Sequence, residues 1–224
     1  MKFADIFLTL QGESYHSGKP TIFIRTAFCP IRCSWCDTGF ADKDWIKAEY
    51  EFTPSGVLTF IERQMWRTSL VCLTGGEPLL ESETPQLLTE LALDDFKTGV
   101  ETSGVVKLVP YLKHLSSFTL DKTSFVVDIK TPSSLQEAKN RYEDWSYLRK
   151  GQDQLKAVIA DRKDYEFVRE VLKKHNPKVE VLLSPMCSDD GKRFDSAKQL
   201  ARWILEDQLN VRMQMQLHKI AEIK

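Results

Sequence analysis

Three cysteines within eight residues carry the clearest chemical signal in the sequence. Cys29, Cys33 and Cys36 lie in the segment FCPIRCSWCDT, with three residues between the first two and two between the last two. A loop with this spacing can turn all three thiolates toward one centre. Four-iron clusters usually take four cysteine thiolates, so three ligands leave one iron with an open position. The spacing therefore predicts a four-iron cluster that can bind a further molecule at that iron and act on it.

Two other roles for these cysteines stay open on the sequence alone. A structural zinc site requires four closed ligands, and no fourth ligand is evident beside the three. Cys33 and Cys36 also have the spacing of a redox pair. Cys72 lies in an apolar run, which is typical of a buried small hydrophobic residue. The odd count of five cysteines, without a secretion signal, favours free thiols or metal ligands over a disulfide framework.

A glycine-rich segment, LTGGEPLL at residues 73–80, follows a predicted strand. A strand-to-helix turn needs glycine for a positive φ or for close backbone approach, so Gly75 and Gly76 alone are a weak signal. Together with the cysteine loop and its aromatic residue before the third cysteine, the segment resembles the radical S-adenosylmethionine (SAM) superfamily. That resemblance implies a [4Fe-4S] cluster whose open iron binds SAM and whose electron cleaves it to a 5′-deoxyadenosyl radical.

The resemblance also implies which residues contact SAM. Backbone groups beside Gly75, Gly76 and Glu77 would hold the methionine amino group, and the backbone of Trp35 would approach the adenine. The stretch 128–130 lies where family members often have Ser-Pro-Lys, so its role is open, and Cys187 can be a bystander thiol. The further implied contacts are Cys36, Asp37, Ser103, Asp128, Ile129, Lys130, Ser184, Pro185, Met186 and Cys187.

Four segments narrow the resemblance to one family. LQGE at residues 10–13, FIR at 23–25, CDT at 36–38 and QLHK at 216–219 are similar to 7-carboxy-7-deazaguanine synthases over nearly the whole chain. The family implies conversion of 6-carboxy-5,6,7,8-tetrahydropterin to 7-carboxy-7-deazaguanine with loss of ammonia, in queuosine and deazapurine biosynthesis. In it the adenosyl radical removes the hydrogen at C6 and the cofactor is regenerated. It also implies a homodimer and a flavodoxin or ferredoxin as electron donor.

The same resemblance assigns substrate and magnesium contacts. Arg25 would bind the substrate carboxylate, for which a planar guanidinium is well suited. Thr38 would bind Mg²⁺ through its hydroxyl, with Asp37 beside it, since this hard cation prefers oxygen ligands. The remaining implied substrate contacts are Leu10, Gln11, Gly12, Glu13, Thr74, His218 and Lys224.

Two of these contacts carry a specific chemical expectation. Glu13 can accept hydrogen bonds from the amino and ring N–H groups of the pterin. Lys224 lies six residues beyond His218, and we expect its α-carboxylate to fold into the pocket and accept from the same edge. Several of the implied contacts also have a purely structural alternative: a surface salt bridge for Arg25, a plain turn for residues 10–13, a helix cap for Thr38, a structural histidine for His218 and a frayed terminus for Lys224.

An alternative to this family is a glycyl-radical activating enzyme, which uses the same kind of iron-sulfur cluster. Glycyl-radical activating enzymes also carry Asp-Ile-Lys at a strand end, as residues 128–130 do here. Such an enzyme acts on a protein and does not need the LQGE and QLHK segments. A zinc-binding module without catalysis is the second rival.

The elements that must position these residues alternate between strands and helices. We expect strands at residues 3–8, 21–27, 70–74, 98–101, 125–129, 155–160 and 179–183 and a final strand over VRMQMQLHK. Thr53 and Pro54 open a helix that runs to about Trp66, and residues 165–172 and 197–204 form amphipathic helices. Alternation of this kind predicts an α/β fold, and the length favours a partial (β/α)6 TIM-like barrel over a full one. A C-terminal strand would close the substrate pocket.

Composition limits the remaining possibilities. The chain has 224 residues, of which 42% are hydrophobic, and this fits a single domain over residues 1–224 with a core of its own. The formal net charge of −1 without a long basic run argues against a nucleic-acid partner and favours a small-molecule substrate. The sequence has no signal-peptide pattern and no apolar run of membrane-spanning length, so we expect a cytoplasmic protein without a membrane partner.

Overall fold

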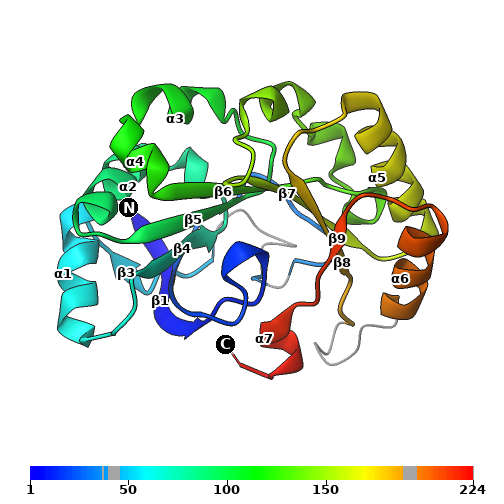
Figure 1. Ribbon diagram of the computed structural model, residues 1–224. Coiled ribbons are helices and arrows are strands. Elements are labelled where there is room, and N and C mark those ends of the chain that lie inside the picture. The colour runs from blue at the N-terminus through cyan, green and yellow to red at the C-terminus, as the bar shows by residue number, and fades with distance from the viewer. Residues whose placement is uncertain (37, 40–45, 189–195, 224) are drawn as a thin grey trace.

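The computed structural model describes residues 1–36, 38–39, 46–188 and 196–223. Its centre is one sheet with the strand order β3-β1-β2-β4-β5-β6-β7-β8-β9, which curves into an arch with the larger helices on its outer side (Figure 1). The strands are β1 (Lys2–Leu10), β2 (Pro20–Thr26), β3 (Tyr50–Glu51), β4 (Leu70–Gly75), β5 (Lys97–Thr102), β6 (Thr123–Asp128), β7 (Gln154–Ile159), β8 (Glu180–Pro185) and β9 (Arg212–Met213).

Six consecutive longer strands of the sheet, β2 and β4 to β8, run parallel to one another, and the two-residue strand β9 continues this parallel pairing beside β8. Strands β3 and β9 lie at the two ends of the order, so the described part of the sheet is an open barrel. The prediction of a partial (β/α)6 barrel is therefore confirmed. The helices are α1 (Pro54–Gln64), α2 (Thr84–Leu93), α3 (Val109–His114), α4 (Ser117–Asp121), α5 (Arg162–His175), α6 (Ala197–Glu206) and α7 (Leu217–Ile220).

The structure departs from the sequence expectations at three places. Strand β1 pairs antiparallel with β2, so it extends the parallel sheet at one edge instead of starting a βαβ unit. The connection from β6 to β7 holds three 3-10 helices, η3 (Pro132–Ser134), η4 (Glu137–Lys139) and η5 (Tyr142–Tyr147), in place of an α-helix. The final strand expected over VRMQMQLHK is wrong beyond Met213, because the chain leaves the sheet there and forms α7.

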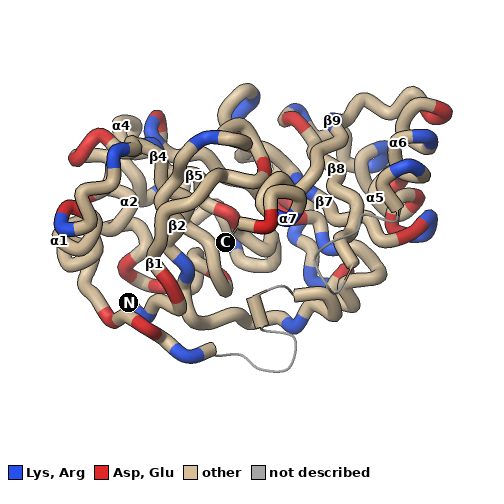
Figure 2. Tube along the Cα trace, turned by 90° about the horizontal axis from the view of Figure 1, so that it is seen from below, with Lys and Arg blue, Asp and Glu red and all other residues tan. Residues whose placement is uncertain are grey.

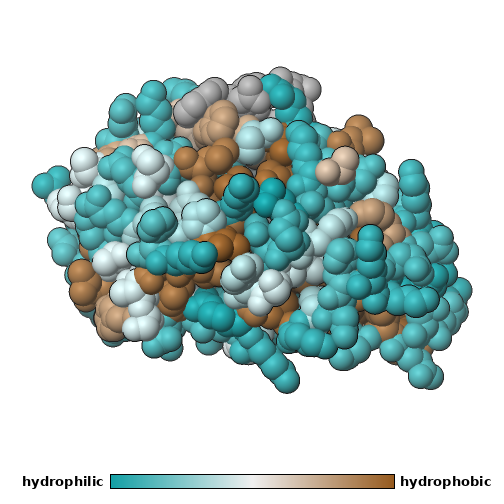
Figure 3. Space-filling view, turned by 90° about the horizontal axis from the view of Figure 1, so that it is seen from above, coloured by the Kyte–Doolittle hydropathy of each residue, from teal (hydrophilic) through white to brown (hydrophobic). Residues whose placement is uncertain are grey.

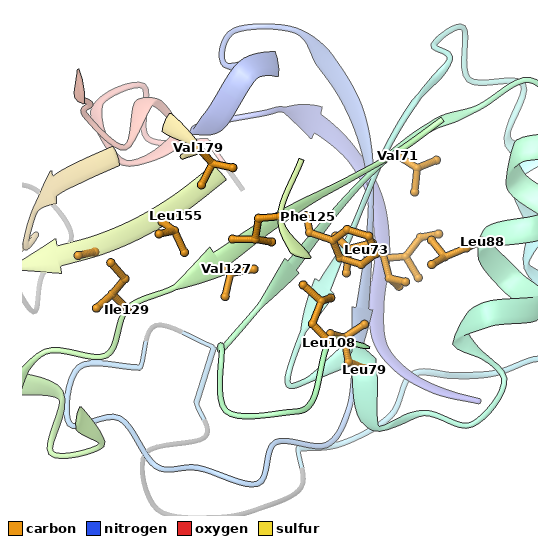
Figure 4. Packing of buried hydrophobic residues seen from close by; sticks show 14 of the residues in the cluster. Val71, Leu73, Leu79, Leu88, Leu108, Phe125, Val127, Ile129, Leu155 and Val179 are labelled. Atoms are coloured by element: carbon orange, nitrogen blue, oxygen red, sulfur yellow. The ribbon is translucent and has the colours of Figure 1, made fainter. Parts of the chain in front are cut away.

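Side chains alternate along the parallel strands between the core and the inside of the arch. Val71 and Leu73 of β4 and Phe125 and Val127 of β6 point into the core beneath the helices (Figure 4). The residues that alternate with these along each strand face the inside of the barrel, and many of them are polar. Because side chains alternate along each strand, one face of the sheet packs against the helices, and the other lines the inside of the barrel, where a site can form.

The helices begin and end where the sequence provides caps. Thr53 precedes α1 and its hydroxyl accepts a hydrogen bond from the N–H of Gly56 at 3.2 Å, with Pro54 at the first helical position. Such a cap contributes about 1 kcal/mol. Helix α5 buries Tyr165 and Val168 against the sheet, as its amphipathic pattern predicts.

The outer surface is mixed in charge and largely hydrophilic. Lys and Arg are interspersed with Asp and Glu along the outer helices, including α5 and α6 (Figure 2). Figure 3 shows apolar residues lying between hydrophilic ones on the upper face. In the part of the chain that the structure describes, no helix is long and apolar enough to cross a membrane.

Candidate active site

A cavity of about 450 Å³ lies inside the arch, toward the carboxyl ends of the parallel strands. Arg25 of β2, Thr74 of β4, Glu101 of β5, Asp128 of β6 and Lys156 of β7 all line it. Arg25 pairs with Thr74, and Asp128 with Lys156, in the register of the sheet. The carboxyl ends of barrel strands are where enzymes of this architecture place their active sites.

The three cysteines of the loop after β2 all line this cavity. Cys29 and Cys33 are buried, and Cys36 is partly exposed. Burial raises the pKa of Cys29 to about 11 and also raises the pKa of Cys33, which disfavours the thiolate form of both side chains unless a cation is bound to them.

The three thiols do not converge on a single ion. Among the described residues, no three Cys, His, Asp or Glu side chains stand close enough to hold one metal ion. A zinc site needs such convergence. A four-iron cluster does not, because each of its cysteines binds a different iron. The three thiols on one wall of the cavity thus suit the cluster better than zinc.

The glycine turn after β4 holds the start of the cysteine loop. The N–H of Gly76 donates to Thr26 O at 3.0 Å, and the N–H of Glu77 donates to Phe28 O at 2.7 Å. A Cβ on Gly76 would lie 1.7 Å from Phe28 O, and Gly75 has a φ of +112° and a Cβ position 2.3 Å from Thr26 N. Two backbones can approach this closely only where one carries no side chain.

Glu77 lies beneath the cavity and does not line it. Its buried carboxylate accepts from Thr102 Oγ1 at 2.8 Å, from Ser103 N at 2.8 Å and from Leu79 N at 3.0 Å. Burial raises the pKa of Glu77, and these hydrogen bonds oppose the rise. Its side chain therefore ties the glycine turn to the end of β5, which carries Ser103 at the cavity wall.

Arg25 and Thr38 meet on one side of the cavity. Arg25 Nη1 donates to Thr38 Oγ1 at 3.1 Å, and the guanidinium lies 5.5 Å from the centre of the Phe7 ring. Arg25 Nε is buried with no hydrogen-bond partner among the described residues. A guanidinium with unused donors at a cavity wall is suited to bind an anionic group of a ligand.

The loop that follows β1 and the segment that follows β9 meet at the cavity. Leu217 N donates to Gly12 O at 3.0 Å, and a Cβ on Gly12 would lie 1.9 Å from His218 Nδ1. Gln214 bridges the same region, since its Oε1 accepts from Ser14 N at 3.0 Å and its Nε2 donates to a serine of β8 at 3.1 Å. Figure 1 shows α7, red, beside the blue N-terminal loop. Helix α7 and this loop, and not a strand, therefore close this side of the pocket.

Buried charges form a network on the inner face of β5 to β7. Lys156 Nζ donates to Glu13 Oε2 at 2.7 Å and lies 3.5 Å from Asp128 Oδ1, while Lys130 Nζ lies 2.6 Å from Asp128 Oδ2. Burial alone would raise the pKa of Asp128, but Lys130 and Lys156 lower it below its usual value. The two lysines thus favour the ionised form of Asp128.

Glu101 is the third carboxylate of this network that lines the cavity, after Glu13 and Asp128. Its Oε1 accepts from Gln11 Nε2 and its Oε2 from Thr74 Oγ1, both at 3.3 Å. Burial raises the pKa of Glu101, and Lys156 opposes this rise. Glu101 thus connects two residues that the sequence assigned to substrate binding.

The structure places most of the predicted site residues at one cavity. Those that line it are Gln11, Glu13, Arg25, Cys29, Cys33, Trp35, Cys36, Thr38, Thr74, Gly75, Gly76, Ser103, Asp128, Lys130, Met186, Cys187 and His218. Those that do not line it are Leu10, Gly12, Glu77, Ile129, Ser184 and Pro185, all of which except Leu10 are buried. Asp37 and Lys224 lie outside the described residues.

Several residues of the wall were not anticipated. They include Glu101, Lys156, Phe23, Val158, Gln216 and Lys219. A usable signal exists for the first two: each is a charged residue at an inward position of an otherwise apolar strand, in GVET and QLKAVI. A buried charged residue requires a partner, so such positions mark a polar interior.

Comparison with known proteins agrees with this geometry. The radical SAM superfamily matches residues 23–174, from β2 through most of α5, so the chain belongs to that superfamily.

More similar relatives define the family. The chain is 35% identical to the 7-carboxy-7-deazaguanine synthase of Koribacter versatilis, over 98% of this chain and 96% of that protein. It is 34% identical to the enzyme of the same name from Methanospirillum hungatei, over 98% of this chain and 84% of that protein. The chain therefore belongs to the 7-carboxy-7-deazaguanine synthase family of radical SAM lyases.

A solved structure shares the fold. The crystal structure of QueE from Escherichia coli superimposes with a TM-score of 0.68 at 23% identity, covering 97% of this chain and 94% of that one. Streptococcus suis SuiB superimposes with a TM-score of 0.54 over 86% of this chain and 48% of that one. The fold is thus shared by proteins that differ widely in sequence.

Proposed function

We propose that this protein converts 6-carboxy-5,6,7,8-tetrahydropterin to 7-carboxy-7-deazaguanine with loss of ammonia, in queuosine or deazapurine biosynthesis. The observation that carries the proposal is that the loop after β1 and the segment after β9 meet at the cysteine-lined cavity, where they place Glu13 and His218 on its wall. The pterin has two distinct polar ends, a carboxylate and an amino-pyrimidinone edge. Arg25 and Glu13 offer complementary charges for them.

The cluster and SAM fit the residues that would hold them. Cys29, Cys33 and Cys36 provide three thiols on one wall of the cavity, and Trp35 and the glycine turn lie beside them. When bound, these groups supply a carbon-centred radical that can remove a hydrogen atom from the substrate. The protein's own contribution is to hold the substrate in one orientation and to exclude other hydrogen donors.

Each end of the substrate has a matching set of side chains. The Arg25 guanidinium, with its Nε free of protein partners in the described structure, would pair with the carboxylate. Glu13 would accept from the amino and ring N–H groups. Gln11 and Thr74, both bonded to Glu101, would contact the pterin ring between these ends.

Magnesium fits beside Thr38 only together with the substrate. The Thr38 hydroxyl lies 3.1 Å from the Arg25 guanidinium, so a cation bound there would be repelled by the arginine. The substrate carboxylate, lying between the two cations, would remove that repulsion. Mg²⁺ keeps several waters and needs few protein ligands, so one hydroxyl and one carboxylate are enough to fix it.

The reaction needs one electron at a time, and we infer a flavodoxin or ferredoxin as its source. Family likeness supports a homodimer and a cytoplasmic enzyme.

The function is tested by anaerobic turnover of the reconstituted enzyme. With SAM, a reductant, Mg²⁺ and carboxytetrahydropterin, mass spectrometry should detect 7-carboxy-7-deazaguanine and one equivalent of ammonia. Thr38→Ala should lose most of the magnesium dependence and retain the cluster. An enzyme with full iron content that cleaves SAM but leaves the pterin unchanged would refute the proposal.

A further inference from the structure

Lys156 is a buried cation in the middle of β7 whose ammonium group faces the cavity. Its residue is 8% exposed. Nζ donates to Glu13 Oε2 at 2.7 Å and lies 3.5 Å from Asp128 Oδ1. Glu13 follows β1, and Asp128 ends β6. Lys156 therefore joins the N-terminal loop to the central strands.

Only one of the two carboxylate oxygens of Glu13 has a hydrogen-bond partner in the described structure. The residue is 5% exposed and lines the cavity, and its Oε2 is bonded to Lys156. Its Oε1 is buried and has no hydrogen-bond partner among the described residues. The Glu13 N–H donates to Gln11 Oε1 at 3.2 Å, which fixes the loop. Buried carboxylate oxygens are normally hydrogen-bonded, so Oε1 is suited to accept from a ligand in the cavity.

The two carboxylates do not depend on Lys156 equally. Asp128 has a second cation, Lys130, at 2.6 Å, whereas Glu13 has no second cation at hydrogen-bond distance in the described structure. Burial would lower the pKa of Lys156, but Asp128, Glu13 and Glu101 raise it well above its ordinary value, so the ammonium stays charged. Removing Lys156 would leave Glu13 without its cation, while Asp128 would keep Lys130.

We propose that Lys156 is a positioning residue for substrate specificity: it holds the Glu13 carboxylate oriented so that Oε1 accepts from an amino group beside a ring N–H. The inference rests on the proposed function, because the pterin presents this edge. Lys156 acts on the substrate only through Glu13. A ligand without the amino group cannot donate this hydrogen bond to Glu13 Oε1, so its affinity does not depend on the Lys156–Glu13 pair. Lys156 therefore sets the preference for 2-amino heterocycles.

The test is a double-mutant cycle on substrate binding to the reconstituted, SAM-bound enzyme under anaerobic conditions. The variants are Lys156→Met, Glu13→Gln and the double variant, each titrated with carboxytetrahydropterin and with its analogue lacking the 2-amino group. Lys156→Met should weaken substrate binding by about 30-fold or more, the effect of removing one partner of a buried charge pair. The double variant should bind no more weakly than Glu13→Gln, because the lysine acts through that carboxylate.

Controls separate this inference from a general loss of structure. Lys122→Met removes a lysine paired with Asp95 away from the cavity and should leave both affinities unchanged. Iron content and SAM cleavage should match the parent in every variant. If Lys156→Met does not fold, the double variant, in which both charges are removed, still tests the inference against Glu13→Gln.

Different results of this experiment would contradict the role of Lys156 and the proposed function. Unchanged substrate affinity in Lys156→Met, equal loss for both ligands, or additive losses in the double variant would overturn the role of Lys156. A parent enzyme that does not turn over carboxytetrahydropterin would overturn the proposed function instead, whatever the variants show.

Discussion

The His218 imidazole occupies the space that a side chain on Gly12 would need, because a Cβ there would lie 1.9 Å from His218 Nδ1. These residues are far apart in the sequence and lie together at the edge of the cavity. The adjacent hydrogen bond from Leu217 N to Gly12 O, at 3.0 Å, holds the same two segments together. The position of the chain's final helix thus depends on a glycine near its start.

Gly12→Ala should displace α7 without disturbing the cluster. Overpacking of this kind costs about 1–3 kcal/mol, so we expect the substrate KM to rise by roughly tenfold or more while iron content stays at the parent level. The measurement is KM together with iron analysis. Gly99→Ala is a matched control, since the nearest atom to its new Cβ is 3.7 Å away. A normal KM in Gly12→Ala would show that α7 does not contribute to substrate binding.

Cluster assembly should depend on the three loop cysteines and not on Cys72. Cys33→Ala should abolish the reduced four-iron EPR signal and the associated turnover, because two thiolates cannot replace three. Cys72 is buried in β4, outside the cavity wall, so Cys72→Ala should keep its iron. A Cys33→Ala protein with full iron content and activity would contradict the assignment.

The cysteine loop could be predicted from sequence because its function is encoded locally. Cys29, Cys33 and Cys36 are separated by only a few residues, so their spacing alone limits what they can bind. The glycine turn was also recognisable, although its structural purpose was not. Gly76 allows contact with Phe28, and that contact exists only when β2 and β4 are neighbours.

The network of buried charges around Lys156 could not be predicted from the sequence in the same way. Asp128 and Lys156 become neighbours through the register of β6 and β7, which the sequence does not state. The final segment was misassigned because VRMQMQLHK alternates like a strand. Its Gln214 side chain instead bonds to Ser14 N and Ser184 Oγ, and these tertiary contacts take the chain out of the sheet.

Arg25→Ala should weaken substrate binding strongly. Removing one partner of a buried charge pair costs about 2–5 kcal/mol, so the KM should rise at least about tenfold, with a possible loss in kcat as well. Steady-state kinetics with matched cluster content provide the measurement. Arg162→Ala breaks an exposed pair with Glu166 and should have no effect. An increase below about tenfold would place Arg25 outside the substrate pocket.

Tyr165 should make the packing of α5 against α6 sensitive to alkali. Its hydroxyl lies 2.9 Å from both Trp203 O and Asp207 Oδ2, and burial together with Asp207 raises the pKa of Tyr165 to about 12. A raised pKa contributes stability below the unfolded value of about 10, and this stability is lost as the pH rises toward 12.

Tyr165→Phe should therefore be less stable than the parent at neutral pH, by about 0.5–1.5 kcal/mol for the lost hydrogen bond. Between pH 10 and pH 12 the parent should lose stability faster, so the difference should narrow. Urea unfolding at pH 7 and pH 11 measures both values. A difference that stays constant with pH would show that the tyrosine hydroxyl does not control this behaviour.

In the proposed reaction the adenosyl radical removes the hydrogen at C6 of the pterin, and this hydrogen can be followed directly. The measurement uses carboxytetrahydropterin labelled with deuterium at C6, the reconstituted enzyme, SAM and a reductant, with mass spectrometry of the recovered SAM and of the product. The account predicts that deuterium moves from C6 into SAM while unlabelled 7-carboxy-7-deazaguanine forms. SAM that is cleaved without gaining deuterium, with the label still on the pterin, would contradict it.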